Sequence, residues 1–166
     1  SEIKRLGDVF VETASRLQKL QPDLRISTFV APTVRDLVTP LIARMPGVIV
    51  VTDDEKKEDV FNAATASLAC SGSVTTELAL QGTPMVIGYR LGQITYFIAK
   101  NFLFRGTYVT LLNVASNKEI VPEFLQDKCT PETLAPAVLK LLTDPAARAR
   151  QVAEQNAALE AMAGVG

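Results

Sequence analysis

The chain has 166 residues, of which 48% are hydrophobic and 21% are charged, a composition typical of one globular domain and not of a disordered chain. Its 17 basic and 18 acidic residues give a formal net charge of −1 without a long run of one sign, which argues against binding of nucleic acid through a basic face. The absence of histidine excludes Ser-His-Asp and Cys-His catalysis and argues against zinc, and two cysteines, Cys70 and Cys129, give no disulfide framework.

The sequence shows no sign of a membrane or secretory segment. No apolar run approaches the length of a transmembrane helix, and no signal peptide opens the chain. Cys70 ends an apolar run and is expected to be a buried strand residue in a reducing compartment. We therefore expect the cytoplasm as the location.

Five strands are predicted to alternate with helices along a single domain of residues 1–166. The predicted strands cover residues 24–31, 48–51, 66–70, 85–88 and 108–112. The predicted helices cover residues 1–20, 32–45, 53–64, 74–81 and 94–104, followed by two C-terminal helices at about 131–143 and 145–162. Thr130 and Asp144 each precede a proline and are predicted N-caps, and the β-branched run 48–51 is typical of a strand buried on both faces.

This alternation predicts the α/β class with a mostly parallel sheet. Ligands of such sheets bind beyond the carboxyl ends of the strands, where the strand order switches. Three sets of polar residues follow predicted strands, and we expect them to meet on one edge of the sheet. They are Ser71 to Ser73, Tyr89 with Arg90, and Asn113.

Residues 66–90 predict a strand, a tight turn, a helix and a second strand, a βαβ unit with the sequence ASLACSGSVTTELALQGTPMVIGYR. The turn Ser71-Gly72-Ser73 consists of small residues at a helix N-terminus, where backbone N–H groups and the helix dipole favour an anion. Glu77 lies four residues after Ser73 on the same helix face. A diphosphate at the turn and a sugar hydroxyl pair on Glu77 would suit a nucleotide-sugar. Alternatively, the serines only cap the helix and Glu77 is solvated.

Two stretches carry a resemblance to lipid-A-disaccharide synthases. One is Cys70-Ser71-Gly72-Ser73-Val74-Thr75-Thr76-Glu77-Leu78-Ala79, and the other is Gly82-Thr83-Pro84-Met85-Val86-Ile87-Gly88-Tyr89-Arg90. They resemble that family's A/C-S-G-T-x-T-x-E-x-x-L and P-M-V-V-x-Y-R stretches. The likeness continues through residues 95–100, 108–113 and 120–126. Most of the matching residues lie between 69 and 126. The stretches taken together are specific for the family, whereas no single one of them is.

The resemblance implies the donor-binding half of an inverting glycosyltransferase of the GT-B type, whose Rossmann-like sheet carries helices on both faces. Such enzymes transfer 2,3-diacylglucosamine from UDP to 2,3-diacylglucosamine 1-phosphate without a metal or other cofactor. By position, the diphosphate would contact Ser71, Gly72, Ser73 and Thr75, with Arg90 as a further phosphate candidate. The ribose hydroxyls would contact Glu77, and the nucleotide would contact Asn113.

The sequence departs from the family pattern in several places. Ser73 replaces a threonine and keeps the hydroxyl, whereas Leu112 replaces the proline before Asn113, and residues 113–117 differ from the usual N-L-L-A-G. The acceptor domain, which would supply the general base, and the P-G-S-R phosphate loop are not in the sequence. We therefore predict that this chain alone has no transferase activity.

Other interpretations remain open at this stage. Arg90 could pair with a phosphate or form a surface ion pair. Asn113 could form hydrogen bonds with the backbone of a turn at the end of its strand. Asp53 and Asp54 resemble the acidic pocket of a phospho-receiver module, although N-capping of the next helix is the preferred interpretation. Residues 92–105 combine aromatic and basic side chains that would suit peripheral contact with the inner membrane, or core packing. Another UDP-sugar transferase, such as one acting on undecaprenyl-linked muropeptides, is the nearest alternative enzyme.

A further expectation concerns the sheet. In a doubly wound sheet the strands lie in the order 3-2-1-4-5-6, so the first strand is central. If the chain begins just after the family's phosphate loop, this first strand is missing, and the strands at 24–31 and 66–70 flank its vacant position. We rank three solutions. A strand outside this sequence comes first, a segment exchanged between two copies in a homodimer second, and direct pairing of the two flanking strands last.

Overall fold

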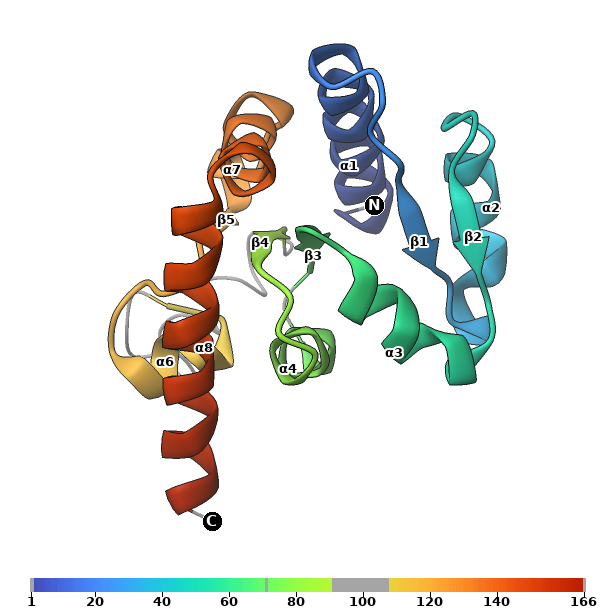
Figure 1. The fold of residues 1–166 in the computed structure, drawn as a ribbon. Helices are drawn as coiled ribbons and strands as arrows, with labels where there is room; N and C mark the ends of the chain where they lie inside the picture. Colours follow the sequence, from blue (N-terminus) through green and yellow to red (C-terminus); the bar gives the residue numbers. More distant parts are fainter. Residues whose placement is uncertain (1, 71, 91–107, 166) are drawn as a thin grey trace.

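The computed structural model describes residues 2–70, 72–90 and 108–165, and these form an α/β fold (Figure 1). The strands are β1 (Ser27–Phe29), β2 (Ile49–Val51), β3 (Ser67–Ala69), β4 (Met85–Tyr89) and β5 (Glu123–Leu125). The helices are α1 (Glu2–Leu20), α2 (Arg35–Ile42), α3 (Asp54–Ala63), α4 (Ser73–Leu80), α6 (Leu111–Ser116), α7 (Pro131–Thr143) and α8 (Pro145–Val165), with 3-10 turns at Pro32–Val34 and Gln126–Lys128. The helix predicted over 94–104 lies outside the described residues.

The strand predicted over residues 108–112 is wrong. Helix α6 begins at Leu111, and the fifth strand is instead β5. The carboxylate of Glu123 accepts hydrogen bonds from the backbone N–H groups of Val109 at 3.0 Å and Thr110 at 2.9 Å, and so binds the chain just before α6. A contact made across the fold therefore overrides the local strand preference of this apolar run.

The strands form two parallel sheets. The order in the larger sheet is β3-β4-β5, and β1 pairs with β2 in the smaller one. Within the described residues β1 and β3 are not hydrogen-bonded to each other, and helix α3 leads from one sheet to the other (Figure 1). Direct pairing of the two flanking strands, the solution ranked last, is therefore not adopted.

Strand β4 lies at the centre of the core. Its residues Met85 and Ile87 pack on one face with α4, α6 and α8, whereas Val86 packs on the other face with α1 and α7, and all three are fully buried. Successive strand side chains point to opposite faces, so a strand covered on both faces is apolar at every position. The predicted parallel α/β class, with helices on both faces of the sheet, is confirmed.

Gly88 allows α1 and α7 to approach β4 closely. A Cβ at this position would lie 3.1 Å from the Cys129 Sγ, 3.1 Å from Phe10 Cε1 and 3.3 Å from Leu134 Cδ1. We expect Gly88→Ala to lower the free energy of unfolding by about 1–3 kcal/mol, because a methyl group overpacks this side of the core. Gly164→Ala is the matched control, since nothing lies within 4 Å of the place that its methyl group would take and alanine favours the helix. Equal urea midpoints for both variants would contradict this packing role.

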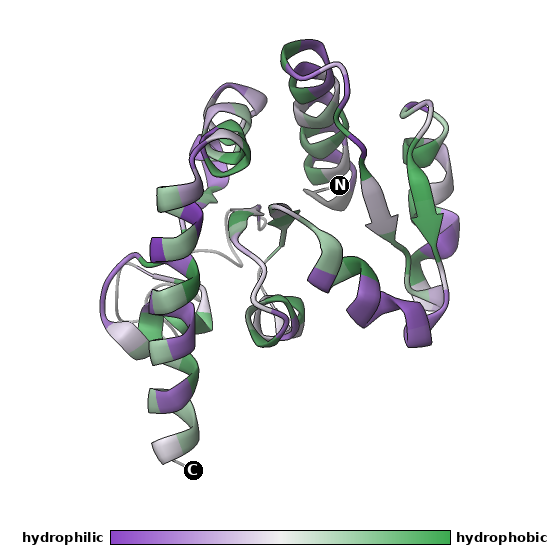
Figure 2. Cartoon of the chain, viewed as in Figure 1, coloured by the Kyte–Doolittle hydropathy of each residue, from purple (hydrophilic) through white to green (hydrophobic). Residues whose placement is uncertain are grey.

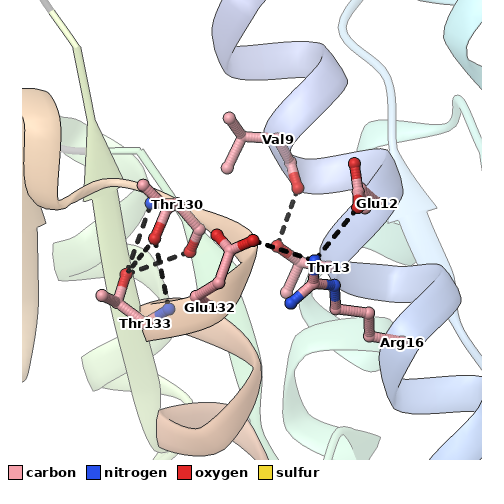
Figure 3. Close-up of polar contacts among 7 residues, drawn as sticks. All are labelled: Val9, Glu12, Thr13, Arg16, Thr130, Glu132 and Thr133. Atoms are coloured by element: carbon pink, nitrogen blue, oxygen red, sulfur yellow. Dashed lines mark hydrogen bonds and ion pairs between the residues drawn. The ribbon is translucent and has the colours of Figure 1, made fainter.

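Helices α1 and α7 are joined by polar contacts as well as by the core (Figure 3). The Arg16 guanidinium binds Glu132 at 2.9 Å and Glu12 at 3.2 Å. Thr130 caps α7, and its hydroxyl accepts a hydrogen bond from the backbone N–H of Thr133 in a reciprocal capping box. The N-cap predicted at Thr130 is confirmed, and so is that at Asp144, whose carboxylate accepts from the N–H groups of residues 146 and 147.

Two buried glutamines of α8 bind the backbone where β4 begins. The Gln151 Oε1 accepts a hydrogen bond from the Met85 N–H at 2.6 Å, and the Gln155 Nε2 donates to the Thr83 carbonyl at 3.2 Å. These backbone groups are buried and would otherwise need another partner. The C-terminal helix therefore contributes polar contacts to the centre of the sheet as well as apolar side chains.

Strand β2 is less buried than its sequence predicts. Ile49 and Val50 are 49% and 41% exposed, although the unbroken β-branched run indicated burial on both faces. Figure 2 shows β2 as a hydrophobic strand near the outside of the fold. The prediction of two buried faces is wrong here, because the two-stranded sheet offers less cover than the larger one.

Candidate functional site

The turn after β3 has a backbone conformation that requires glycine. Gly72 has φ 139° and ψ −163°, which side chains rarely allow, while nothing lies within 4 Å of the position of an added Cβ. The glycine is therefore needed for its conformation and not for space. Gly72 is the N-cap of α4, so the N–H groups of Ser73 and Val74 have no side-chain cap from it and suit an anion, whereas the Thr75 N–H binds the Gly72 carbonyl at 3.1 Å.

The hydroxyl groups of this turn have different roles. Ser73 is exposed at the start of α4, whereas Thr75 is 1% exposed, and its Oγ1 donates to the Gly72 carbonyl at 2.8 Å. Thr75 thus stabilises the turn from inside, and Ser73 is the hydroxyl that a ligand could reach. Ser71, the first residue predicted for this site, lies outside the described residues.

Glu77 lies one turn into α4 beside a pocket of about 220 Å³ between α3 and α4. The pocket lining includes Asp54, Lys57, Glu58, Phe61 and Glu77. The Lys57 Nζ is 3.1 Å from the Glu77 Oε1, and 42% of the Glu77 side chain is exposed. Glu77 is therefore partly exposed beside this pocket, and its contact with a ligand at the turn stays a prediction.

Arg90 follows β4 directly, and within the described residues its guanidinium binds a backbone carbonyl instead of forming an ion pair. Its Nη2 and Nε donate to the Cys129 carbonyl at 2.9 and 3.3 Å. This pair of hydrogen bonds connects the end of β4 to the segment that precedes α7. A contact between Arg90 and a phosphate stays a prediction.

Asn113 lies inside α6 and is fully buried, and is not a strand-end residue as predicted. Its Nδ2 donates to the Val121 carbonyl at 2.8 Å, and its Oδ1 accepts from the N–H groups of Ile120 and Val121, each at 2.9 Å. The side chain thus satisfies the backbone that enters β5, at the opposite end of that strand from the carboxyl edge. This is the structural alternative named from the sequence, and contact with a nucleotide stays a prediction.

Both thiols are poor nucleophiles. Burial, with a smaller effect of the neighbouring Cys129, raises the pKa of Cys70 to about 11, and burial also raises the pKa of Cys129. Each thiol is protonated at neutral pH, whereas the thiolate is the reactive form. Neither cysteine is therefore expected to act as a nucleophile.

Asp53, the first residue of the acidic pair after β2, has a structural role. The Asp53 carboxylate accepts a hydrogen bond from the Glu55 N–H at 2.9 Å and caps α3, as the preferred interpretation predicted. The predicted aromatic and basic segment 92–105 lies outside the described residues, so its membrane contact stays a prediction. Among the helices that are described, none combines the length and apolarity needed to cross a bilayer.

Sequence reasoning missed two residues that shape the site and its surroundings. Lys57 stands in a highly charged helix, where nothing distinguishes it from the neighbouring Lys56. Glu123 binds the backbone before α6, but only its partners across the fold reveal this.

A parallel α/β fold with helices on both faces of the sheet defines a Rossmann-like domain. The profile of the family described as lipid-A-disaccharide synthetase matches residues 1–164, and the chain belongs to this family. Lipid-A-disaccharide synthases from Bradyrhizobium diazoefficiens, Nitrobacter winogradskyi and Paramagnetospirillum magneticum are 42%, 41% and 40% identical to it, respectively. These matches cover 92%, 92% and 96% of this chain but 39%, 38% and 41% of the relatives, so the chain spans about two fifths of their length.

Proposed function

We propose that this chain is the donor-binding part of a lipid-A-disaccharide synthase, an inverting glycosyltransferase of lipid A biosynthesis. Its ligand is UDP-2,3-diacylglucosamine, and the reaction transfers the acylated sugar to 2,3-diacylglucosamine 1-phosphate with release of UDP. Membership of the family and the names of the relatives support this assignment.

One arrangement in the structure carries the proposal. The glycine turn ends a strand of the parallel sheet and starts α4, whose N-terminal N–H groups suit a diphosphate. Glu77 follows one turn later and remains partly exposed. We propose that this carboxylate, whose two oxygens both accept hydrogen bonds, binds the ribose hydroxyl pair of a nucleotide whose diphosphate lies at the turn.

The reaction also needs a general base within hydrogen-bond reach of the acceptor's 6-hydroxyl. We propose that this base and the acceptor site lie in a part of the protein outside these residues, in keeping with the greater length of the relatives. The chain alone then binds the donor without transferring the sugar.

We also propose that an additional parallel strand lies between β1 and β3. The observed orders β1-β2 and β3-β4-β5 become one continuous sheet if such a strand joins them. The combined order is that of a doubly wound sheet with its first strand at the centre. The new strand would pair with the sides of β1 and β3 that, within the described residues, have no partner strand.

Titration calorimetry with UDP tests the donor site. We expect the chain to bind UDP, and Gly72→Ala to weaken this binding about tenfold or more, because the strained turn can no longer hold its N–H groups toward the diphosphate. Gly47→Ala is the matched control, since Gly47 also has a positive φ of 81° but lies outside the site. A folded chain that gives no heat with UDP, or equal affinities for the two variants, would contradict the proposed site.

A further inference from the structure

We propose that Lys57 is a positioning residue that holds the Glu77 carboxylate in place for the ribose hydroxyls of the donor. The proposal rests on the proposed function of this chain as a UDP-sugar-binding domain. Its starting point is the contact of 3.1 Å between the Lys57 Nζ and the Glu77 Oε1. Within the described part of the chain, this is the one hydrogen bond to the Glu77 carboxylate.

Lys57 is itself fixed by a third element of the fold. Its Nζ lies 5.2 Å from the centre of the Phe29 ring, a distance at which an ammonium group is attracted to an aromatic face. Phe29 belongs to β1, Lys57 to α3 and Glu77 to α4. The side chain of Lys57 is 22% exposed, against 42% for Glu77, so the lysine is the more enclosed member of the pair. The lysine therefore orients the carboxylate, and not the reverse.

The contact leaves the carboxylate able to bind a diol. An ionised carboxylate has two oxygens with about four acceptor positions in total. Lys57 occupies one position on Oε1, so positions on both oxygens remain for two ribose hydroxyls. Lys57 restricts rotation of the Glu77 side chain before the ligand binds. The conformational entropy lost when the ribose binds is therefore smaller.

The charges around the pocket favour the same role. Asp54, Glu58 and Glu77 all line it, and Lys57 is the cation among its lining residues. Carboxylates near one another repel, and the ammonium group offsets this repulsion and keeps the Glu77 carboxylate beside it. A partly exposed ion pair contributes little to folding stability. The variant that removes it is therefore expected to fold.

The experiment compares UDP with 2′-deoxy-UDP, which differs in one ribose hydroxyl. Dissociation constants of both nucleotides are measured by calorimetry for the unaltered chain and for Glu77→Gln, Lys57→Met, Lys57→Arg and Lys56→Met. We expect Glu77→Gln to remove the preference for UDP. Lys57→Met should weaken UDP binding about threefold to tenfold and 2′-deoxy-UDP binding clearly less, because only one hydroxyl of that ribose reaches the carboxylate, while Lys57→Arg restores most of the preference.

Lys56→Met is the matched control, because it removes the same charge from an exposed position of the same helix. It should leave both affinities nearly unchanged. Circular dichroism melting confirms that each variant is folded.

The outcomes separate this inference from the proposed function. If Glu77→Gln removes the ribose preference but Lys57→Met does not, Lys57 is not a positioning residue and the donor site stands. Equal weakening of both nucleotides by Lys57→Met would assign the lysine to the phosphates and overturn the inference. An unchanged preference in Glu77→Gln would remove Glu77 from the site and the inference with it.

Discussion

Replacing Asn113 by leucine is expected to lower the free energy of unfolding by about 3 kcal/mol or more. The substitution removes three hydrogen bonds from a fully buried side chain. It leaves the Val121 N–H and carbonyl without this partner, whereas the Ile120 N–H keeps the Lys118 carbonyl at 3.1 Å. Each buried polar group left unpaired costs about 1–3 kcal/mol. Because whole domains are stable by only about 5–15 kcal/mol, this loss is a large fraction of the total stability. Urea denaturation followed by circular dichroism measures the loss.

Asn117→Gly is the control for the Asn113 variant. Asn117 ends the same helix, is exposed and has a left-handed backbone with φ 52°, which glycine adopts readily. We expect the stability of this variant to change by less than about 1 kcal/mol. If Asn113→Leu unfolds at the same urea concentration as Asn117→Gly, the hydrogen bonds of the buried Asn113 amide do not contribute the expected stability.

The largest effect in the sheet is expected in hydrogen exchange at the facing sides of β1 and β3. The Val30 N–H binds the Val51 carbonyl and the Ser67 N–H binds the Pro84 carbonyl, each at 2.9 Å. Since alternate residues of a strand direct their N–H groups to opposite sides, those of Phe29 and Leu68 point toward the proposed strand position. We expect them to exchange rapidly in the 166-residue chain. A longer protein that supplies the proposed strand should slow them by roughly two orders of magnitude or more.

The amides of Val30 and Ser67 provide the internal reference, because both are bonded within the present sheets. If Phe29 and Leu68 exchange equally fast in the longer protein, no strand occupies the position between them. Protection that appears in the 166-residue chain and increases with protein concentration would instead indicate exchange of a segment between two copies.

Much of the fold could be predicted because periodicity and capping are local. Helix α1 follows apolar spacing, and α3, α7 and α8 begin at caps visible in the sequence. The error at residues 108–112 has a different origin. An apolar β-branched run is compatible with a strand or a buried helix start, and the bond from Glu123, more than ten residues later, decides between them.

The candidate site was predictable to the same extent. The turn at Gly72 and the position of Glu77 follow from a strand, a tight turn and a helix in sequence order. The roles of Thr75, Arg90 and Asn113 do not follow from the sequence. Each of these side chains donates to a backbone carbonyl, and Asn113 also accepts from backbone N–H groups, and the sequence does not identify these partners. Lys57 was missed for the same reason, since its partners Phe29 and Glu77 lie on two other elements.

The two glutamines of α8 also constrain the order of folding. Gln151 and Gln155 bind backbone groups that lie 66 and 72 positions earlier in the chain, at the entrance to the most buried strand. During synthesis, β4 therefore leaves the ribosome long before the side chains that complete its hydrogen bonding. Contacts between distant positions form slowly, because a long loop must close before they are made. Completion of the central strand thus waits for the last helix, and until then this apolar segment needs protection from other chains.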